Sequence, residues 1–127
     1  MKKYLITILF TVCLIFGQDY QIATISIGDT VSSVVTMSRT SKGLQTPTMF
    51  QTDTLSQADS LYIQVYNPIH QTYLTLEDTS GLPVLYQIEA NRTYWFDSDY
   101  FRGVEKFRFF VSDTDSIAIN YPVFKVD

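Results

Sequence analysis

The sequence predicts an all-β fold, in which two antiparallel sheets pack face to face as a sandwich of eight or nine strands. Three observations predict it. Apolar and polar residues alternate with a period of two in segment after segment, as in half-buried strands. Turn residues separate these segments at intervals of about 8–12 residues, the spacing of a sandwich or jelly roll. Aromatic residues make up 15% of the chain and supply large side chains for a core.

The first half of the domain predicts two strands and a long loop. A first strand places Ala23, Ile25 and Ile27 on one face, and a looser second strand follows at 31–37. The stretch 38–55 is rich in Thr, Ser and Gln, so we expect a loop that contains one short strand around Leu44 to Phe50.

The second half predicts the remaining strands, each with an inward apolar face. The inward sets are Leu61, Ile63 and Val65; Leu74 and Leu76; Val84, Tyr86 and Ile88; Phe107, Phe109 and Val111; and Ile117, Ile119, Tyr121 and Val123. A short aromatic strand is expected at 93–97, followed by one helical turn at 98–102. Pro122 lacks the amide that a central ladder needs, which predicts that the last strand lies at an edge or carries a bulge.

Residues 1–17 have the pattern of an export signal peptide, which predicts a helix ahead of the domain. A basic start is followed by an apolar run from Leu5 to Phe16 and by the small residue Gly17. The run is shorter than the roughly 20 apolar residues of a membrane-spanning helix. We therefore expect cleavage near Gln18, and a protein that is secreted, periplasmic or held at the cell surface.

Signal removal leaves one domain, 18–127, without cysteine, since Cys13 lies in the apolar run. The core must then be held by packing without disulfides. Lys2 and Lys3 leave with the signal, so seven basic residues remain against thirteen acidic ones, a net charge of −6. A surface of this sign repels nucleic-acid phosphates and anionic membranes, which argues against both as partners.

Strand and turn patterns follow one another in six segments of the domain: 24–33, 44–50, 61–65, 71–78, 100–105 and 107–112. In their order and pattern, these segments resemble a jelly-roll module of tailed-phage and prophage structural proteins. The most particular is the run Asp99-Tyr100-Phe101-Arg102-Gly103, which looks like the family's short turn before a long core strand. The resemblance implies a non-catalytic building block of a virion or surface particle.

The resemblance and the signal peptide together predict an exported structural or interaction protein, working through assembly partners or self-association. Virion proteins assemble in the cytoplasm, so the export signal favours a surface or secreted role and leaves a virion structural protein as a second alternative. The same fold serves many functions, which keeps the fold prediction separate from this choice.

A carbohydrate-binding module is the first alternative, and aromatic residues carry it. Tyr62, Tyr66 and Tyr73 alternate with inward residues, so we expect them on an outward face, where sugar rings stack on aromatic platforms. Trp95 alternates with Tyr94 and Phe96 in the same way. Cross-strand pairing or contact with another subunit is the favoured interpretation of these rings.

Two acidic pairs, Asp97 with Asp99 and Asp113 with Asp115, are candidate calcium ligands, because each sets two carboxylates on one side of an extended segment. Side-chain bonding to turn amides explains them without a metal and is favoured, so we expect no cofactor.

We expect no enzymatic activity. His70 is the only histidine and no Gly-x-Ser-x-Gly motif is present, so a hydrolase is disfavoured. Glu77, Glu89 and Glu105 are available as glycosidase carboxylates, but the sequence does not fix their separation in space.

Overall fold

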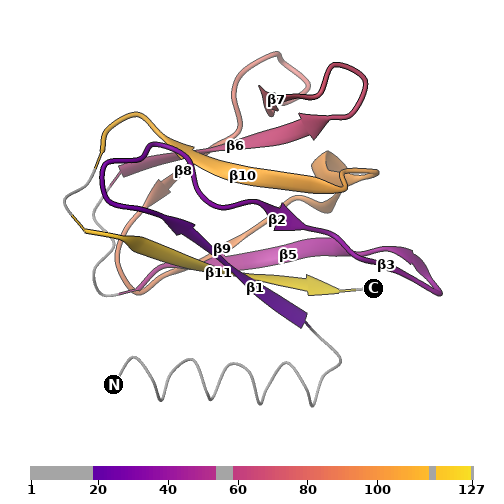
Figure 1. Cartoon of the computed structure of the whole chain (residues 1–127), viewed down its shortest axis with the longest axis horizontal. Coiled ribbons are helices and arrows are strands. Elements are labelled where there is room, and N and C mark those ends of the chain that lie inside the picture. Colours follow the sequence, from indigo (N-terminus) through magenta and orange to yellow (C-terminus); the bar gives the residue numbers. More distant parts are fainter. Residues whose placement is uncertain (1–18, 54–58, 115–116, 127) are drawn as a thin grey trace.

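The computed structural model describes residues 19–53, 59–114 and 117–126, and these form an all-β protein. The predicted signal peptide, residues 1–17, lies outside the described residues. Figure 1 shows the strands in two layers, with β6 and β10 above β1, β5 and β11. One 3-10 turn, η1 (Ser98–Phe101), lies between the strands Thr93–Trp95 and Lys106–Val111. It confirms the helical turn expected at 98–102.

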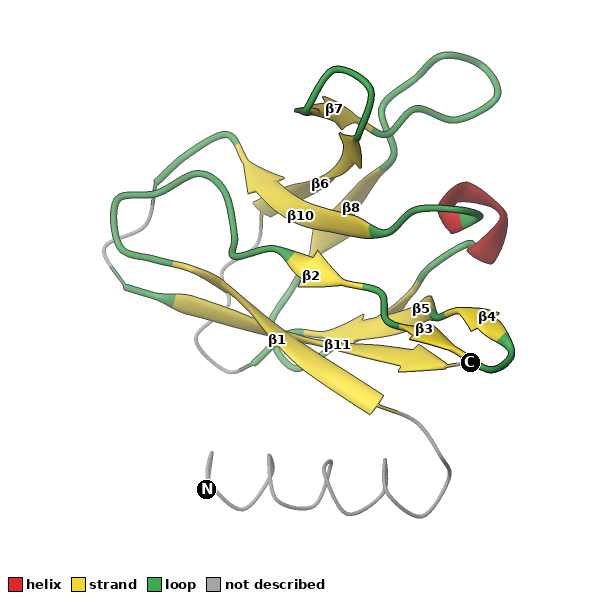
Figure 2. Cartoon of the chain, turned by 45° about the vertical axis from the view of Figure 1, so that its right-hand side comes forward, coloured by secondary structure: helices red, strands yellow, loops and turns green. Residues whose placement is uncertain are grey.

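Eleven strands occur in the described part of the chain, where eight or nine were expected. They are β1 (Asp19–Ile25), β2 (Val35–Thr36), β3 (Arg39–Thr40), β4 (Gly43–Leu44), β5 (Thr46–Gln51), β6 (Asp59–Asn67), β7 (Thr72–Thr75), β8 (Leu85–Ile88), β9 (Thr93–Trp95), β10 (Lys106–Val111) and β11 (Ile119–Val126). The difference arises from the two-residue strands, of which β3 and β4 form a small hairpin beside the C-terminal end of β11 (Figure 2).

Sheet A has the order β1-β11-β5-β9, and every pairing in it is antiparallel. The first and last strands are neighbours, paired from Asp19 opposite Lys125 to Ile25 opposite Ile119. Strand β5, which comes from the stretch expected to be mostly loop, lies inside this sheet. It confirms the one short strand expected within 38–55, and its residues Pro47 and Phe50 are buried.

Sheet B has the order β2-β10-β6-β7 and is also antiparallel. Strand β6 is long enough to take two partners along one edge: β8 pairs with its residues 59–62 and β7 with its residues 64–67. Strand β10 lies along the other edge of β6. Both β6 and β10 are therefore interior strands.

Aromatic rings from the two sheets meet in one core. Phe50 of β5 is fully buried and contacts five other rings at centroid distances of 5.0 to 6.1 Å. Those rings belong to Tyr86, Tyr94, Phe96, Phe109 and Tyr121. Burial of a phenylalanine side chain contributes roughly 1.5–3 kcal/mol, so this cluster stabilises the contact between the sheets.

Two polar side chains connect the sheets at their margins. Ser32, in the segment between β1 and β2, is buried, and its hydroxyl accepts a hydrogen bond from the Phe109 amide at 2.9 Å. Tyr86 of β8 donates its hydroxyl to the Trp95 carbonyl of β9 at 3.2 Å. Burial and the nearby Asp97 carboxylate raise the pKa of Tyr86 to about 12, because both disfavour the phenolate.

Two details of the expected strands are wrong. Ile27 is 65% exposed, because β1 ends at Ile25 and the chain turns at Gly28, where φ is +80°. Leu74, expected to face inward, is 51% exposed on β7. For the last strand two alternatives were expected, an edge position or a bulge, and β11 is an interior strand with an irregular register. Its ladder with β5 begins only at Val123, so Pro122 has a strand partner on the β1 side alone, and a register shift lies between Phe124 and Lys125.

Candidate functional site

The outward face of sheet B carries an ordered group of aromatic and cationic side chains, which we call the tyrosine face. Its members are Tyr62, Tyr66, Tyr73, Lys106, Arg108 and Phe110. Alternation in β6 and β10 produces it: Leu61, Ile63, Phe107 and Phe109 are buried toward the core, and the residues between them are partly buried on the opposite side.

The aromatic members pair across neighbouring strands. Tyr66 of β6 lies opposite Tyr73 of β7, and their ring centroids are 5.3 Å apart at an interplanar angle of 58°. Tyr62 of β6 lies opposite Phe110 of β10, at a centroid distance of 6.1 Å. The three tyrosines expected on one outward face are thus brought to one face, as cross-strand neighbours.

Two cations from β10 lie over the tyrosine rings. The Lys106 ammonium is 4.0 Å from the centroid of the Tyr66 ring. The Arg108 side chain reaches past β6, where its Nε donates to the Gln64 side chain at 2.9 Å, and its guanidinium lies 4.0 Å from the centroid of the Tyr73 ring. Each of these two rings therefore has a cation over one of its faces.

Lys106 and Arg108 have no carboxylate within ion-pair distance among residues 19–53, 59–114 and 117–126. Four other cations of that part of the chain do have such a partner. The pairs are Arg39 with Glu105, Arg92 with Glu89, Arg102 with Asp99 and Lys125 with Asp19. The six members of the tyrosine face include two cations and no Asp or Glu, so together they carry positive charge in a chain whose net charge is −4.

Trp95 is not part of this face. It lies on β9 of sheet A, opposite Met49, and is 68% exposed, whereas its neighbour Tyr94 stacks on the core ring Phe50 at 5.2 Å. Alternation within 93–97 placed Trp95 outward, but the sequence did not indicate which sheet would hold it. Conversely, Lys106, Arg108 and Phe110 were not recognised, although they alternate with Phe107 and Phe109 in the sequence.

Three residues of the acidic pairs, Asp97, Asp99 and Asp113, are exposed. The Asp97 carboxylate accepts a hydrogen bond from the Asp99 amide at 3.0 Å and caps η1, and Asp99 pairs with Arg102 at 3.3 Å. Asp113 is exposed, and Asp115 lies outside the described residues. Within the described ranges, no group of three or more His, Cys, Asp or Glu residues is arranged to hold a metal ion.

His70 and the glutamates are dispersed over the surface. His70 is exposed in the β6–β7 turn, where its amide donates to the Asn67 side chain at 3.4 Å. Glu105 bonds Arg39 at 2.7 Å and Glu89 bonds Arg92 at 3.1 Å. Glu89 and Glu105 therefore each have an ion-pair partner.

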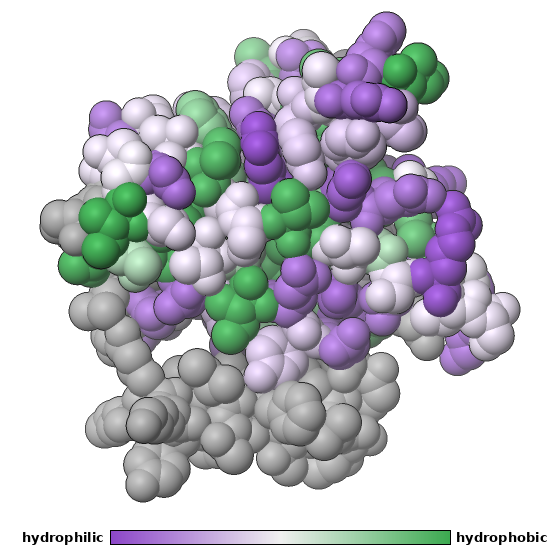
Figure 3. Space-filling view, in the orientation of Figure 1, coloured by the Kyte–Doolittle hydropathy of each residue, from purple (hydrophilic) through white to green (hydrophobic). Residues whose placement is uncertain are grey.

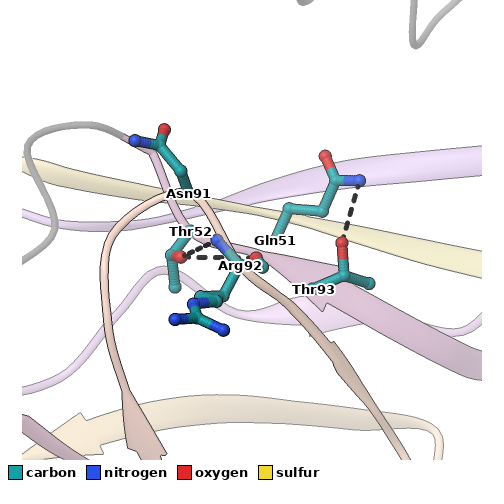
Figure 4. Close-up of a pocket in the computed structure, with 5 residues that line it drawn as sticks. All are labelled: Gln51, Thr52, Asn91, Arg92 and Thr93. Carbon is teal, nitrogen blue, oxygen red and sulfur yellow. Dashed lines mark hydrogen bonds between the residues drawn. The ribbon is translucent and has the colours of Figure 1, made fainter.

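A shallow pocket of about 170 Å³ lies where the end of β5 meets the β8–β9 turn. Its lining residues are Gln51, Thr52, Asn91, Arg92 and Thr93 (Figure 4). The Thr52 hydroxyl accepts from the Arg92 amide at 2.9 Å and donates to the Glu89 carbonyl, so buried Thr52 ties the turn to β5. These bonds give Thr52 a structural role.

Exposed apolar side chains form separate groups on the face shown in Figure 3, with polar side chains between them. Among the described residues, no helix has the length and apolar character needed to cross a membrane. Comparisons of the chain with protein-family models, curated proteins and solved structures found no match.

Proposed function

We propose that the chain is an exported, non-catalytic interaction protein that contacts its partner through the tyrosine face. The observation that carries the proposal is the pair of cations, Lys106 and Arg108, held over tyrosine rings without a carboxylate partner in the described part of the chain. Partly exposed aromatic and cationic groups on the face of a sheet are the side chains that interfaces favour, with Tyr and Arg prominent among binding hot spots.

The fold proposed for this protein is a jelly-roll β-sandwich. Strand order supports it, because β1, β5, β9 and β11 share one sheet while β2, β6 and β10 share the other, so the chain repeatedly crosses between the layers. Ring contacts such as Phe50 with Phe109, at 5.0 Å, join the two sheets as in a face-to-face packing. The phage-module resemblance is consistent with this fold.

Export is proposed from residues 1–17. Expression of the full chain in a bacterial host, followed by mass spectrometry of the exported protein, tests it. We expect a mature N-terminus at Gln18, and retention of residues 1–17 on exported protein would argue instead for a tethered domain.

The interaction role is tested on the exported protein by light scattering and by recovery of partners from the native cell surface. We expect self-association or a retained partner that is lost in Tyr66→Ala combined with Tyr73→Ala. Trp95→Ala is the control, because Trp95 lies on the other sheet. A monomer that retains no partner would refute the interaction role.

Carbohydrate binding is the second candidate, supported by Tyr66, Tyr73 and the 68% exposed Trp95. A glycan array with the Tyr66→Ala and Trp95→Ala variants separates the two surfaces. Loss of glycan binding in one variant assigns binding to the surface that carries the substituted residue. Glycan binding that neither substitution alters would exclude both surfaces as the binding site.

A further inference from the structure

We infer that the tyrosine face binds an acidic polysaccharide, with Lys106 and Arg108 pairing the carboxylates of its sugar units. The inference rests on the proposed function and adds the class of ligand. Lys106 and Arg108 lie two positions apart on β10, which spaces them by about 7 Å along the strand on the same face.

Both cations retain donors for a ligand. An arginine side chain has five N–H donors, and the Nε of Arg108 uses one on Gln64. The Lys106 ammonium has three, and none of them has a hydrogen-bond partner within the described ranges. Charge-assisted bonds from such groups to carboxylates are stronger than bonds between neutral groups.

The tyrosine rings hold the two cations in place before a ligand arrives. Long Lys and Arg side chains normally lose rotamer freedom on binding, which weakens affinity. Here Tyr66 lies beneath Lys106, and Tyr73 and Gln64 fix Arg108, so part of that ordering has already occurred. The geometry therefore preorganises two positive charges on one surface.

The charge distribution directs an acidic ligand to this face. The chain has a net charge of −4, and four of its other cations are neutralised by the ion pairs described above. Lys42 lies apart from the tyrosine face, in the exposed β3–β4 turn. A polyanion would thus be repelled by most of the surface and attracted at Lys106 and Arg108.

The position of these residues within the sheet favours a saccharide over an acidic peptide. Extended peptides bind sheets by adding a strand to a free edge. Strands β6 and β10 are interior and bond to neighbours on both sides, so a ligand must engage side chains. The outward hydroxyls and amides of Ser60, Gln64, Thr75 and Gln87, next to aromatic rings, match a polyhydroxylated chain.

Affinity electrophoresis of the exported protein in gels containing polygalacturonate tests the inference. Fully methyl-esterified polygalacturonate has the same backbone without the charge, and polyglutamate has the charge without the sugar. We expect retardation by polygalacturonate alone, weakening as NaCl is raised because salt screens the ion pairs.

The variant Lys106→Gln with Arg108→Gln should bind polygalacturonate at least about tenfold more weakly, the loss expected when about 1.4 kcal/mol is removed. Lys42→Gln with Arg92→Gln removes the same charge from the β3–β4 and β8–β9 turns, away from the tyrosine face, and should bind as the wild type does. Thermal melting curves of both double variants that match the wild-type curve would confirm that folding is unaffected.

Three outcomes would overturn the inference. These are no retardation by polygalacturonate, equal retardation by polyglutamate or the methyl ester, and equal losses in the two double variants. None of them refutes the tyrosine face as an interaction surface, which depends on the separate effect of Tyr66→Ala with Tyr73→Ala on partner recovery.

Discussion

The ring of Phe50 in sheet A lies 5.0 Å, centroid to centroid, from the ring of Phe109 in sheet B. Both side chains have no exposed surface. This contact connects the interior strand β5 with the interior strand β10. Because the core is closely packed, neither ring can move without disturbing the side chains around it.

Phe50→Ala should lower the free energy of unfolding by about 3–5 kcal/mol, since it removes a ring that contacts five others and leaves a cavity. Urea denaturation measures the change, and Phe50→Leu should cost less. Ile27→Ala, at a residue that is 65% exposed, is the control and should change stability by no more than about 0.5 kcal/mol. Equal effects of Phe50→Ala and Ile27→Ala would contradict the central position of Phe50.

Ser32→Ala should destabilise the protein by about 1–3 kcal/mol, because the Phe109 amide loses its partner in a buried place. Thermal or urea unfolding measures the loss. Ser41→Ala, in the exposed turn between β3 and β4, serves as the matched control and should be close to neutral. If Ser32→Ala were as stable as the wild type, the hydroxyl would have no role in joining the sheets.

Thr52→Val should cost about 1–3 kcal/mol, since valine keeps the shape but cannot bond to the Arg92 amide or the Glu89 carbonyl. Hydrogen exchange should accelerate most at the amides of residues 89–92, which this hydroxyl orders. Thr72→Val, at an exposed position of β7, provides the comparison. Unchanged exchange at 89–92 would show that the turn is held by other contacts.

Stability should fall between pH 10 and 12 in a way that depends on Tyr86. Its pKa is raised from 10.0 to about 12, so the folded state favours the neutral phenol. That contribution is complete below pH 10 and is lost as the pH rises through 12, because the unfolded state then releases its proton more readily. Unfolding measured from pH 8 to 12 should decline less steeply in Tyr86→Phe than in the wild type, and parallel profiles would refute the assignment.

Alternation predicted most of the strands and their inward faces, since the period of two is a local property. Phe107, Phe109 and Val111 are buried as expected, and Tyr66 and Tyr73 became neighbours because a short turn joins their strands. Long-range pairing was not predictable in this way. The position of β5 inside sheet A depends on β11, which is more than sixty residues away in the chain.

The candidate site was predicted in part for the same reason. Three tyrosines share one face because β6 and β7 form a hairpin, whereas Trp95 belongs to a strand that crosses to the other sheet. Lys106 and Arg108 join the tyrosines through the pairing of β10 with β6, which sequence periodicity does not specify. In the sequence, nothing about these two cations indicated that they would lie over aromatic rings in the sheet.

The pairing of β11 with both β1 and β5 makes β11 decisive for the folding of sheet A. Strands β1 and β5 share no backbone hydrogen bonds with each other, since β11 lies between them. Sheet A can therefore form only once β11 has paired with strands far from it in the sequence, and contacts of such high sequence separation form slowly. Loss of the eight residues of β11 would divide this sheet into two unconnected parts, β1 alone and β5 with β9.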